Sequence, residues 1–388
     1  MTVFINRLAT FLPNAPVSND AIETVLGQVN DVPSRAKRIV LKNNGIKQRH
    51  YAIDPATRAL THTNAQLCAE AVRGLAREPG FRLGDIQCLC CGTTSPDLLF
   101  PGHGLMVLGE LGLPPVEAVT TAGICISGMT AFKYAYMNVA TGMSANAVSV
   151  GSELSASFMR ARFFKSTGRP EGDVGRRPVL AFDTDFLRWM LSDGAGAALL
   201  SDTPNASGIS LRVDWIDNLS YAGELDTCMY GGGIKVEDGR VTGWREVEHI
   251  APEEERCLMA VKQDIRFLEK NIVATMQRAL QASVDKHGLR PDAVDWFLPH
   301  YSSAFFRDKF YNGMAEIGFE IPYDRWFTNL TDKGNTGSAA IYIILEELFH
   351  SGRLKPGQRL LCFIPESGRF SHCFMQLHVV EAHGGDAP

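Results

Sequence analysis

Hydrophobic and polar positions along the chain alternate between strand-like and helix-like patterns. Short, largely apolar runs at 87–95, 117–123 and 145–153 are typical of strands, each ending in a polar or glycine-containing tip. Residues 102–112 have the pattern of a short helix, and 124–142 are apolar on nearly every side. A helix of the second kind is buried rather than amphipathic. This alternation predicts an α/β fold built from layers.

The last third of the chain repeats the same order of patterns. A strand-like run at 294–303 is followed by a loop and a helix over 327–352 and by another strand over 355–368. In each half the second strand ends in a serine and a glutamate, with Glu153 in the first half and Glu366 in the second. The match lies in the pattern rather than in residue identity, but it indicates an internal duplication.

The duplication suggests an N-terminal half over 1–205 and a C-terminal half over 206–388. Two related halves usually build their active site where they meet. The segment 154–190 is rich in arginine, glycine and aromatic residues and is predicted to be an excursion over the core, where substrate contacts often lie. The DGAGA run within 191–202 matches no nucleotide-binding motif, so a nucleotide site is not expected there.

Composition restricts the classes of function. The chain has 388 residues, 45% of them hydrophobic, and a net charge of -5 without a run of basic residues, so we expect no nucleic-acid partner. It lacks a signal-peptide pattern and any apolar window of about 18 residues, which predicts a cytoplasmic protein without a membrane span. The nine cysteines show no repeated spacing and are expected to be reduced, with no metal site.

Cys125 is the strongest candidate for a nucleophile. It lies at the start of the predicted helix 124–142, where unpaired backbone N–H groups and a partial positive charge favour a thiolate. Its small neighbours Gly123, Ser127 and Gly128 leave room for a substrate. Taken alone, this position suits a buried structural cysteine equally well.

Two further residues have a comparable placement. His300 ends an apolar strand, and Asn335 lies in GNTGSAA at the start of the second half's helix, in the place that Cys125 takes in the first half. Taken singly, a solvated histidine and a helix-capping asparagine are the favoured interpretations.

Together these positions resemble a known family. The run TTSPDLLFPGHGLMVLGELGLPPVEAVTTAGICISGMTAFKYAYMNVATG, followed by LSDGAGAALL, DWFLPH and GNTGSAA, resembles the β-ketoacyl-carrier-protein synthase III group of the thiolase superfamily. The resemblance spans 85–205 and 290–380. It implies the thiolase fold, a duplicated αβαβα sandwich of five layers formed from two related halves.

The resemblance also implies a mechanism. Cys125 would take up an acyl group from a thioester, with the oxyanion held by the backbone N–H groups of Cys125 and Gly368. His300 and Asn335 would then donate hydrogen bonds to a second thioester, whose carbanion attacks the acyl-cysteine. No cofactor is expected, because acyl-carrier-protein or coenzyme A thioesters supply the reactivity themselves.

The same resemblance implies a homodimer and a substrate pocket. Phe100 would reach across into the partner's pocket, although an ordinary core position is an equally good interpretation of this residue. Phe158 and Phe370 are predicted to line the pocket as well.

Several positions depart from the family. Ile39 and Asn43 replace a tryptophan and an arginine that hold coenzyme A in the housekeeping enzyme, which favours substrates bound to acyl carrier protein. Lys42, Lys47 and Arg49 could meet a phosphopantetheine phosphate or an acidic carrier protein, or could simply form a solvated basic surface.

The last loop departs too. The family's Gly-Gly-Gly-Phe is Ser367–Phe370 here, following Glu366. With the longer chain, this ending resembles the dialkylresorcinol-forming ketosynthases of the DarB and StlD type. That resemblance implies a Claisen condensation without decarboxylation, followed by ring closure to a 2,5-dialkylcyclohexane-1,3-dione. Glu153 would be the acid/base for ring closure, or else a structural residue that binds loop backbone.

Three other functions are alternatives to the ring-forming activity. The first is a simple decarboxylative condensation that primes fatty-acid or polyketide synthesis. The second is acyl transfer to oxygen or nitrogen, for which a replacement of Asn335 is expected. The third is a non-catalytic partner subunit, which the presence of Cys125, His300 and Asn335 together argues against.

Overall fold

The computed structural model describes residues 1–34, 37–164, 186–236, 239–246 and 258–381. Most of the predicted excursion over 154–190 therefore lies outside the described residues. Its described start forms helix α6 (Ala156–Met159) and a 3-10 turn at Ala161–Phe163.

The sheet of the first half is built around strand β4, whose six residues are all buried. Strand β4 pairs in parallel with β5 and β6, and β6 and β1 each pair antiparallel with β7. A strand covered on both faces needs no polar face, which explains the nearly continuous apolar run of β4. The strands are β1 (Phe4–Phe11), β4 (Cys88–Thr93), β5 (Glu117–Ala122), β6 (Asn146–Glu153) and β7 (Gly194–Ser201).

The sheet of the second half follows a similar plan. Strand β13 pairs in parallel with β14, and β15 pairs antiparallel with both β14 and β8. Phe4 and Ile5 of β1 lie opposite Arg212 and Leu211 of β8, so the two sets of strands join along one edge into a continuous sheet. The strands are β8 (Ile209–Ser220), β13 (Trp296–Pro299), β14 (Arg359–Glu366) and β15 (Ser371–Glu381).

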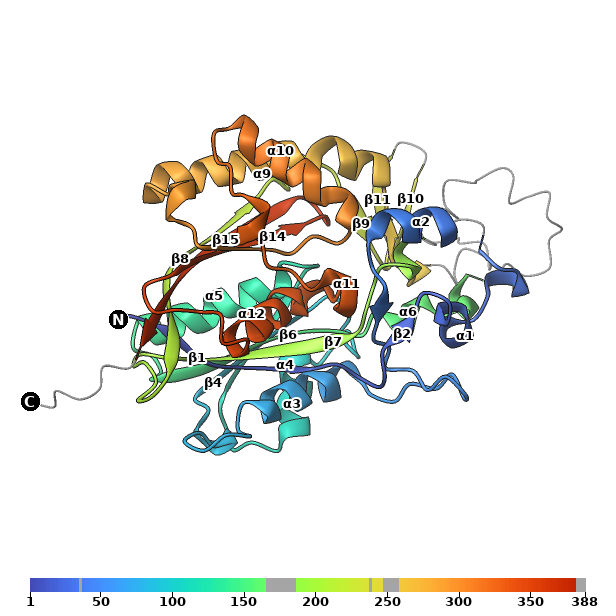
Figure 1. Cartoon of the computed structure of the whole chain (residues 1–388). Helices are drawn as coiled ribbons and strands as arrows, with labels where there is room; N and C mark the ends of the chain where they lie inside the picture. Colours follow the sequence, from blue (N-terminus) through green and yellow to red (C-terminus); the bar gives the residue numbers. More distant parts are fainter. Residues whose placement is uncertain (35–36, 165–185, 237–238, 247–257, 382–388) are drawn as a thin grey trace, which may run out of the picture.

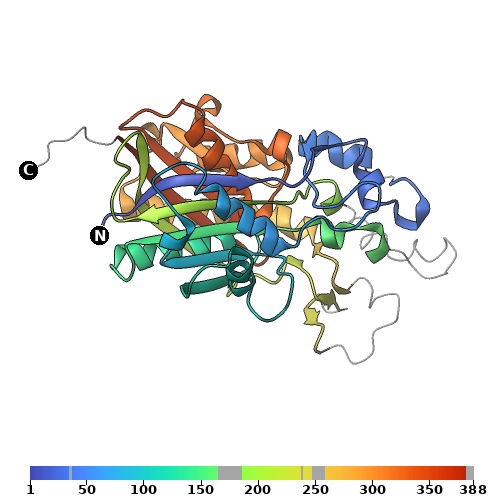
Figure 2. The same cartoon turned by 90° about the horizontal axis from the view of Figure 1, so that it is seen from below.

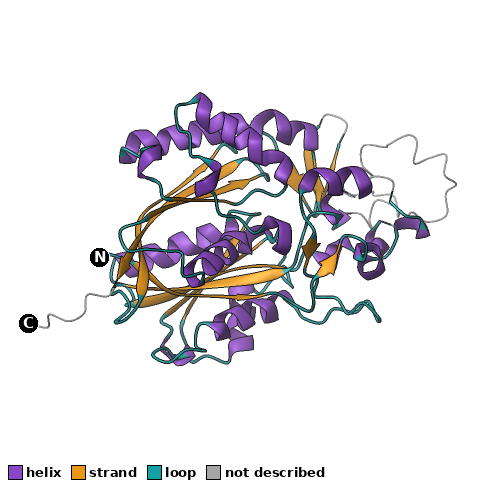
Figure 3. Cartoon of the chain, in the orientation of Figure 1, coloured by secondary structure: helices purple, strands orange, loops and turns teal. Residues whose placement is uncertain are grey.

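Helices form three layers around the two sets of strands (Figures 1 and 3). Helices α5 and α12 lie between the sheets, α3 and α4 cover the outer face of the first, and α9 and α10 cover the outer face of the second. The five layers that the resemblance implies are therefore present. The helices are α3 (Asn64–Gly74), α4 (His103–Leu111), α5 (Ser127–Ala140), α9 (Ile265–His287), α10 (Arg307–Glu316) and α12 (Ala340–His350).

Local sequence signals explain where these helices begin and end. Thr63 and Gln66 form a reciprocal capping box at the start of α3. The Asp264 side chain accepts a hydrogen bond from the Phe267 N–H at the start of α9, and Gly288 ends that helix in a left-handed conformation. No helix in the described part of the chain is long and apolar enough to cross a membrane.

Smaller elements gather at one end of the layers, near the carboxyl ends of β6 and β14. The view from below shows them projecting beyond the main sheets (Figure 2). They are β2 (Val17–Ser18), α1 (Ile22–Leu26), α2 (Lys37–Asn44), β3 (Gln48–Arg49), β9 (Met229–Tyr230), β10 (Gly233–Lys235), β11 (Val241–Gly243), β12 (Lys262–Gln263) and α11 (Leu330–Lys333).

The two halves are held together by close contacts at the start of α12. The Ser338 carbonyl lies so near Gly128 of α5 and Gly151 of β6 that a Cβ at either glycine would be 2.3 Å from its oxygen. The Tyr342 hydroxyl donates a hydrogen bond of 2.8 Å to the Gly128 carbonyl and lies 2.7 Å from Ser149 Oγ. Glycine is required at these two positions because backbone on the facing element occupies the side-chain space.

Replacing Gly151 with alanine should destabilise the protein by about 1–3 kcal/mol or more, because overpacking forces the backbone of the two halves apart. Chemical denaturation followed by circular dichroism measures the change. Gly109→Ala in α4 is the control, since a Cβ there meets nothing within 4 Å and should leave stability unchanged or slightly raised. Equal stability of the two variants would contradict this account of the junction.

Candidate active site

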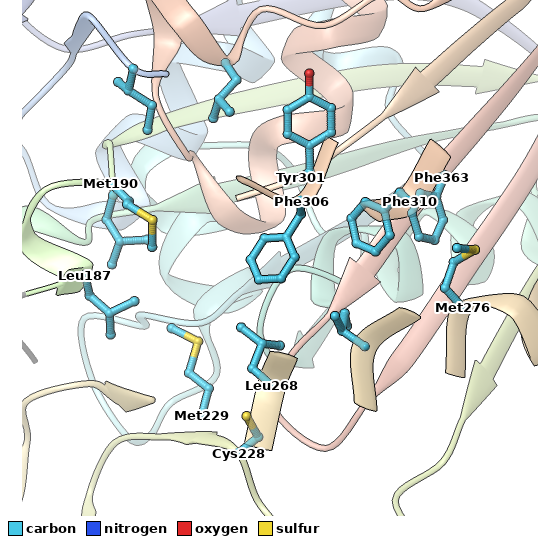
Figure 4. Close-up of a cluster of buried hydrophobic side chains, with 14 of the residues drawn as sticks. Leu187, Met190, Cys228, Met229, Leu268, Met276, Tyr301, Phe306, Phe310 and Phe363 are labelled. Carbon is cyan, nitrogen blue, oxygen red and sulfur yellow. The ribbon is translucent and has the colours of Figure 1, made fainter. Parts of the chain in front are cut away.

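A narrow cavity, partly open to solvent, lies where the two halves meet. Both predicted halves, 1–205 and 206–388, supply residues to its wall. Figure 4 shows Leu187, Met190 and Met229 on one side of the larger buried apolar cluster beside it. The lining residues are Thr94, Ile124, Cys125, Glu153, Ser155, Phe158, Leu187, Met190, Leu191, Met229, Val261, Gln263, Ser302, Asn335, Gly337 and Ser367.

Cys125 lines this cavity and is 8% exposed. It lies in the turn between β5 and α5 rather than inside the helix, because α5 begins two residues later at Ser127. The Ser127 N–H donates to the Ile124 carbonyl at 3.0 Å, which closes this turn. The side chain is thus held at the entrance of the helix, facing the cavity.

The electrostatics of Cys125 differ from the sequence-based prediction. Burial, and then the nearby carboxylates of Glu366 and Glu153, raise the pKa of the thiol well above its usual value, and its own backbone N–H lowers the pKa by less. Desolvation and like charge therefore disfavour, in the free protein, the thiolate expected at the helix start. Cys125 rests as a thiol.

Asn335 lies in the same cavity wall, between α11 and α12, and is 4% exposed. Its backbone N–H donates to the Met190 carbonyl at 3.0 Å, and its carbonyl accepts from the Ser192 N–H at 2.8 Å. The side-chain oxygen accepts from the Gly337 N–H at 3.0 Å. Because the oxygen is engaged, the amide NH₂ is the part of the side chain left to donate to a ligand.

His300 follows strand β13 directly and is 3% exposed. Its backbone N–H donates to the Phe363 carbonyl at 2.8 Å, which extends the pairing of β13 with β14 beyond Pro299. Ser302, two residues further on, lines the cavity. Burial lowers the pKa of the His300 imidazole to about 4, so the ring is neutral at neutral pH and can donate a hydrogen bond without carrying charge.

Glu153 ends β6, lines the cavity and is 2% exposed. Its Oε1 accepts from the Thr94 N–H at 3.1 Å, the Thr94 hydroxyl at 2.6 Å and the Ser338 N–H at 3.2 Å. Its Oε2 accepts from the Ser95 hydroxyl at 3.0 Å. The carboxylate thus links the halves, as a structural glutamate would, while burial raises its pKa toward the range of an acid/base group.

Glu366 occupies the equivalent place at the end of β14. Its Oε1 accepts a hydrogen bond of 2.7 Å from the Gly368 N–H, and a Cβ at Gly368 would lie 2.1 Å from that oxygen. The Gly368 N–H, predicted as an oxyanion donor, is therefore occupied in the free protein. Of the two predicted oxyanion donors, the Cys125 N–H is the one that does not bind the Glu366 carboxylate.

The three predicted aromatic residues lie in different places. Phe158 lines the cavity. Phe370 does not, because it is fully buried in the core with its ring edge against Phe267, at a left-handed φ of 60°. The pocket role of Phe370 stays a prediction, since its ring packs in the apolar cluster that includes Met190 and Met229 of the cavity wall. Phe100 is 77% exposed and lies outside this chain's own cavity, so the ordinary core interpretation is excluded.

The basic residues near α2 differ in their exposure to solvent. Lys42 and Lys47 are exposed, as is Ile39. Arg49 is fully buried, and its guanidinium donates to Asn19 Oδ1 at 2.6 Å and to the Trp189 carbonyl at 3.1 Å. Arg49 is therefore a structural residue and not a phosphate ligand.

Sequence reasoning missed Gln263 altogether and did not place Glu366 beside the nucleophile. Gln263 is 5% exposed, lines the cavity and lies on a strand of two residues, too short to show any pattern. For Glu366 a signal existed, because it takes the same place in the duplicated pattern as Glu153.

Known proteins resemble this chain in sequence and in fold. The C-terminal family of 3-oxoacyl-[acyl-carrier-protein (ACP)] synthase III matches residues 284–364. A β-ketoacyl-[acyl-carrier-protein] synthase III from Hyphomonas neptunium is 23% identical over 362 residues, which cover 92% of this chain and 93% of the relative. The chain is synthase III-like and has the thiolase fold.

Two solved structures extend the comparison. AbyA1, a tetronic acid condensing enzyme, has a TM-score of 0.74 at 19% identity, covering 97% of this chain and 100% of that chain. A cysteine-to-serine variant of OleA from Xanthomonas campestris, with bound lauric acid and lauroyl-CoA, has a TM-score of 0.72 at 17% identity, covering 97% and 99%. The fold predicted for this synthase III-like chain is thus confirmed.

Glu366→Gln should speed the alkylation of Cys125 by iodoacetamide several-fold at a fixed pH near 8. The substitution removes a negative charge that raises the thiol pKa, while the glutamine oxygen can still accept from the Gly368 N–H. The pH–rate profile, followed by peptide mass spectrometry, should shift to lower pH. Glu110→Gln, on the exposed end of α4, is the control. An unshifted profile would show that Glu366 does not act on the thiol.

Proposed function

We propose that the protein is a ketosynthase that condenses two acyl thioesters through an acyl-Cys125 intermediate and then closes the product to a 2,5-dialkylcyclohexane-1,3-dione. The observation that carries the condensation is the shared cavity, in which Cys125 from one half meets the Asn335 amide from the other. The proposed reaction needs no cofactor, since both substrates are activated as thioesters.

In the first step, the Cys125 sulfur attacks the carbonyl carbon of an acyl thioester. The new C–S bond forms, the substrate's C–S bond breaks, and the proton of the Cys125 thiol leaves with the departing thiol. The Cys125 N–H stabilises the oxyanion, and Gly368 can add its N–H when the Glu366 carboxylate moves aside. Each such donor contributes on the order of 3 kcal/mol to the transition state.

In the second step, a thioester with an activated α-carbon binds beside the acyl-cysteine. The NH₂ group of Asn335 and the neutral His300 imidazole donate hydrogen bonds to its carbonyl oxygen, which takes up negative charge as the α-proton passes to water in the open cavity. The carbanion attacks the acyl carbon and a C–C bond forms, while the acyl C–S bond breaks and the Cys125 sulfur takes up a proton from water to leave as the thiol. Donors without charge suit this step because they stabilise an enolate without binding the neutral ketone too tightly.

Two comparisons support condensation over simple acyl transfer. AbyA1 is named a condensing enzyme, and OleA was obtained with a long-chain acyl-CoA. The presence of Asn335 at the cavity adds to this support, since its NH₂ group can donate a hydrogen bond to an enolate oxygen.

Ring closure adds a second carbanion of the β-ketoacyl unit to the unsaturated carbon, which requires a group that removes one proton and returns another. The thioester left on the ring is then hydrolysed by water, and its carboxylate leaves as CO₂ to give the dione. Glu153 is our candidate for the proton transfers, because its carboxylate lies in the cavity wall and burial raises its pKa. The plain alternative is a linear condensation of the synthase III type, which the names of the curated relatives favour.

Incubation with a β-ketoacyl thioester and an α,β-unsaturated acyl thioester should give a cyclic dione by mass spectrometry. Cys125→Ala should abolish both the product and the covalent acyl adduct. Glu153→Gln, which keeps an acceptor oxygen for Thr94 and Ser338, should leave acylation intact but stop cyclisation. If the wild type gave only a linear product, the activity would be simple condensation and not ring formation. An acyl adduct on the Cys125→Ala variant would contradict the assignment of Cys125 as the nucleophile.

Acyl carrier protein is the proposed donor of the substrates. The exposed Lys42 and Lys47 lie on and just after α2, at the end of the layers where the cavity is found, and carry charge that complements an acidic carrier. The exposed Ile39 takes the place where the housekeeping enzyme holds coenzyme A with an aromatic ring.

A homodimer is proposed from the surface around Phe100. Leu98, Leu99, Phe100 and Leu105 are 48%, 66%, 77% and 52% exposed, and β5 lies at the edge of its sheet with partly exposed side chains. Exposed apolar side chains gathered beside an open strand edge are typical of a protein–protein interface. A second copy of this chain would cover both.

Phe100→Asp should shift the protein from dimer to monomer, because it places a charge in the middle of the proposed apolar interface. Size-exclusion chromatography with light scattering measures the change in mass. Ile39→Asp is the matched control, since this residue is also exposed but lies on α2. A Phe100→Asp protein with the mass of the wild type would exclude this surface as the interface.

A further inference from the structure

Gln263 presents a polar group to the cavity that the proposed mechanism does not use. Its side chain is 5% exposed and lines the cavity together with Met229 and Val261. Among the residues that the structure describes, its amide has no hydrogen-bond partner. Apolar side chains, including Leu187, Met190 and Phe158, form much of the remaining wall.

The position of Gln263 is well determined by its neighbours. Strand β12 pairs antiparallel with β9, so Gln263 lies opposite Met229 and Lys262 opposite Tyr230. Adjacent residues of a strand point to opposite faces. Lys262 points away and donates to the Gly233 and Ala260 carbonyls, at 3.2 Å each, whereas Gln263 and Met229 share the face toward the cavity.

The backbone on both sides of Gln263 is tied down as well. The Asp264 N–H donates to the Cys228 carbonyl at 2.8 Å, and the Asp264 side chain begins α9 by accepting from Phe267. These bonds fix the backbone that carries Gln263, with its side chain on the face toward the cavity. Its amide is therefore presented to whatever fills the cavity.

An amide in this position discriminates between acyl chains. A saturated chain that fills the cavity removes solvent from the amide and gives it no partner, which is unfavourable. A chain with an oxygen within reach restores the hydrogen bond. Sites built to bind an oxygen in this way reject the analogue that lacks it far more strongly than apolar pockets reject a change in size.

We propose that Gln263 is a specificity-determining residue that donates a hydrogen bond to the 3-oxo oxygen of a β-ketoacyl chain. The proposal rests on the proposed function, because the chain must be presented as a thioester to Cys125. It assigns an oxygenated acyl group, rather than a saturated fatty acyl group, as the preferred substrate of the cavity.

The test compares two thioesters of equal chain length, the N-acetylcysteamine esters of 3-oxooctanoic and octanoic acid. Loading of Cys125 is followed in single turnovers by intact-protein mass spectrometry. The wild type should load the 3-oxo chain faster, by on the order of tenfold or more in the apparent second-order rate constant. Gln263→Met, similar in length but without a donor, should lose that preference and load the octanoyl chain at least as well as the wild type.

Two further variants distinguish the effect of the amide's polarity on loading from the effect of the cavity's shape. Met229→Leu changes the facing side chain without removing a donor, so it should alter the loading of both chains by the same factor. Gln263→Asn keeps the amide on a shorter stem and should retain part of the preference. A wild type without preference, or a Gln263→Met protein that loads both chains with an unchanged ratio, would overturn the proposal. Loading of neither chain by a wild type that does load the α,β-unsaturated octenoyl thioester would also overturn the proposal, whereas loading of none of the three chains would instead contradict the proposed function.

Discussion

The contact between the Ser338 carbonyl and the glycines Gly128 and Gly151 is the constraint on which the site depends. It allows α12 of one half to approach α5 and β6 of the other at backbone distance. Only because these elements approach so closely can Glu153 at the end of β6 accept a hydrogen bond from the Ser338 N–H. The same approach places Cys125 and Asn335, which precede the two central helices, in one cavity wall.

The duplication gives the site two glutamates with related but unequal surroundings. Glu153 binds Thr94, Ser95 and Ser338 and so joins the halves, whereas Glu366 binds the Gly368 N–H in its own loop and stays beside the nucleophile. In the free protein these carboxylates disfavour a thiolate. In the proposed reaction, attack by Cys125 is coupled to loss of its proton, since the described residues of the cavity wall include no lysine, arginine or histidine that would stabilise a thiolate.

The layers and the placement of the candidate residues could be predicted from the sequence because they depend on patterns of many residues. The buried run of β4, the apolar helix α5 and their counterparts in the second half each span several turns or a whole strand. The same length of pattern placed Cys125 and Asn335 at the starts of corresponding helices. A duplicated pattern also made the two strand-end glutamates visible.

What could not be predicted depends on contacts between distant segments. The loss of thiolate character at Cys125 comes from burial and from Glu366, some 240 residues away in the printed sequence. Arg49 was expected to be a cation on the surface, but it is buried, and its guanidinium binds Asn19 and the Trp189 carbonyl. The turn after Gly368 directs the Phe370 ring into the core. The pattern of neighbouring residues in the sequence does not reveal such contacts.

These distant contacts also explain why substrate choice is harder to predict than chemistry. The reacting groups lie at the ends of long regular elements, whose positions the layers determine. The cavity wall beyond them is made by short segments such as β9 and β12, each of two residues, whose pairing brings Gln263 and Met229 to the same face. Such segments can change their side chains without disturbing the sheets, because few backbone contacts of the layers pass through them. In the proposed function, the layers therefore position Cys125 and Asn335, while these two strands supply the side chains that select the acyl chain.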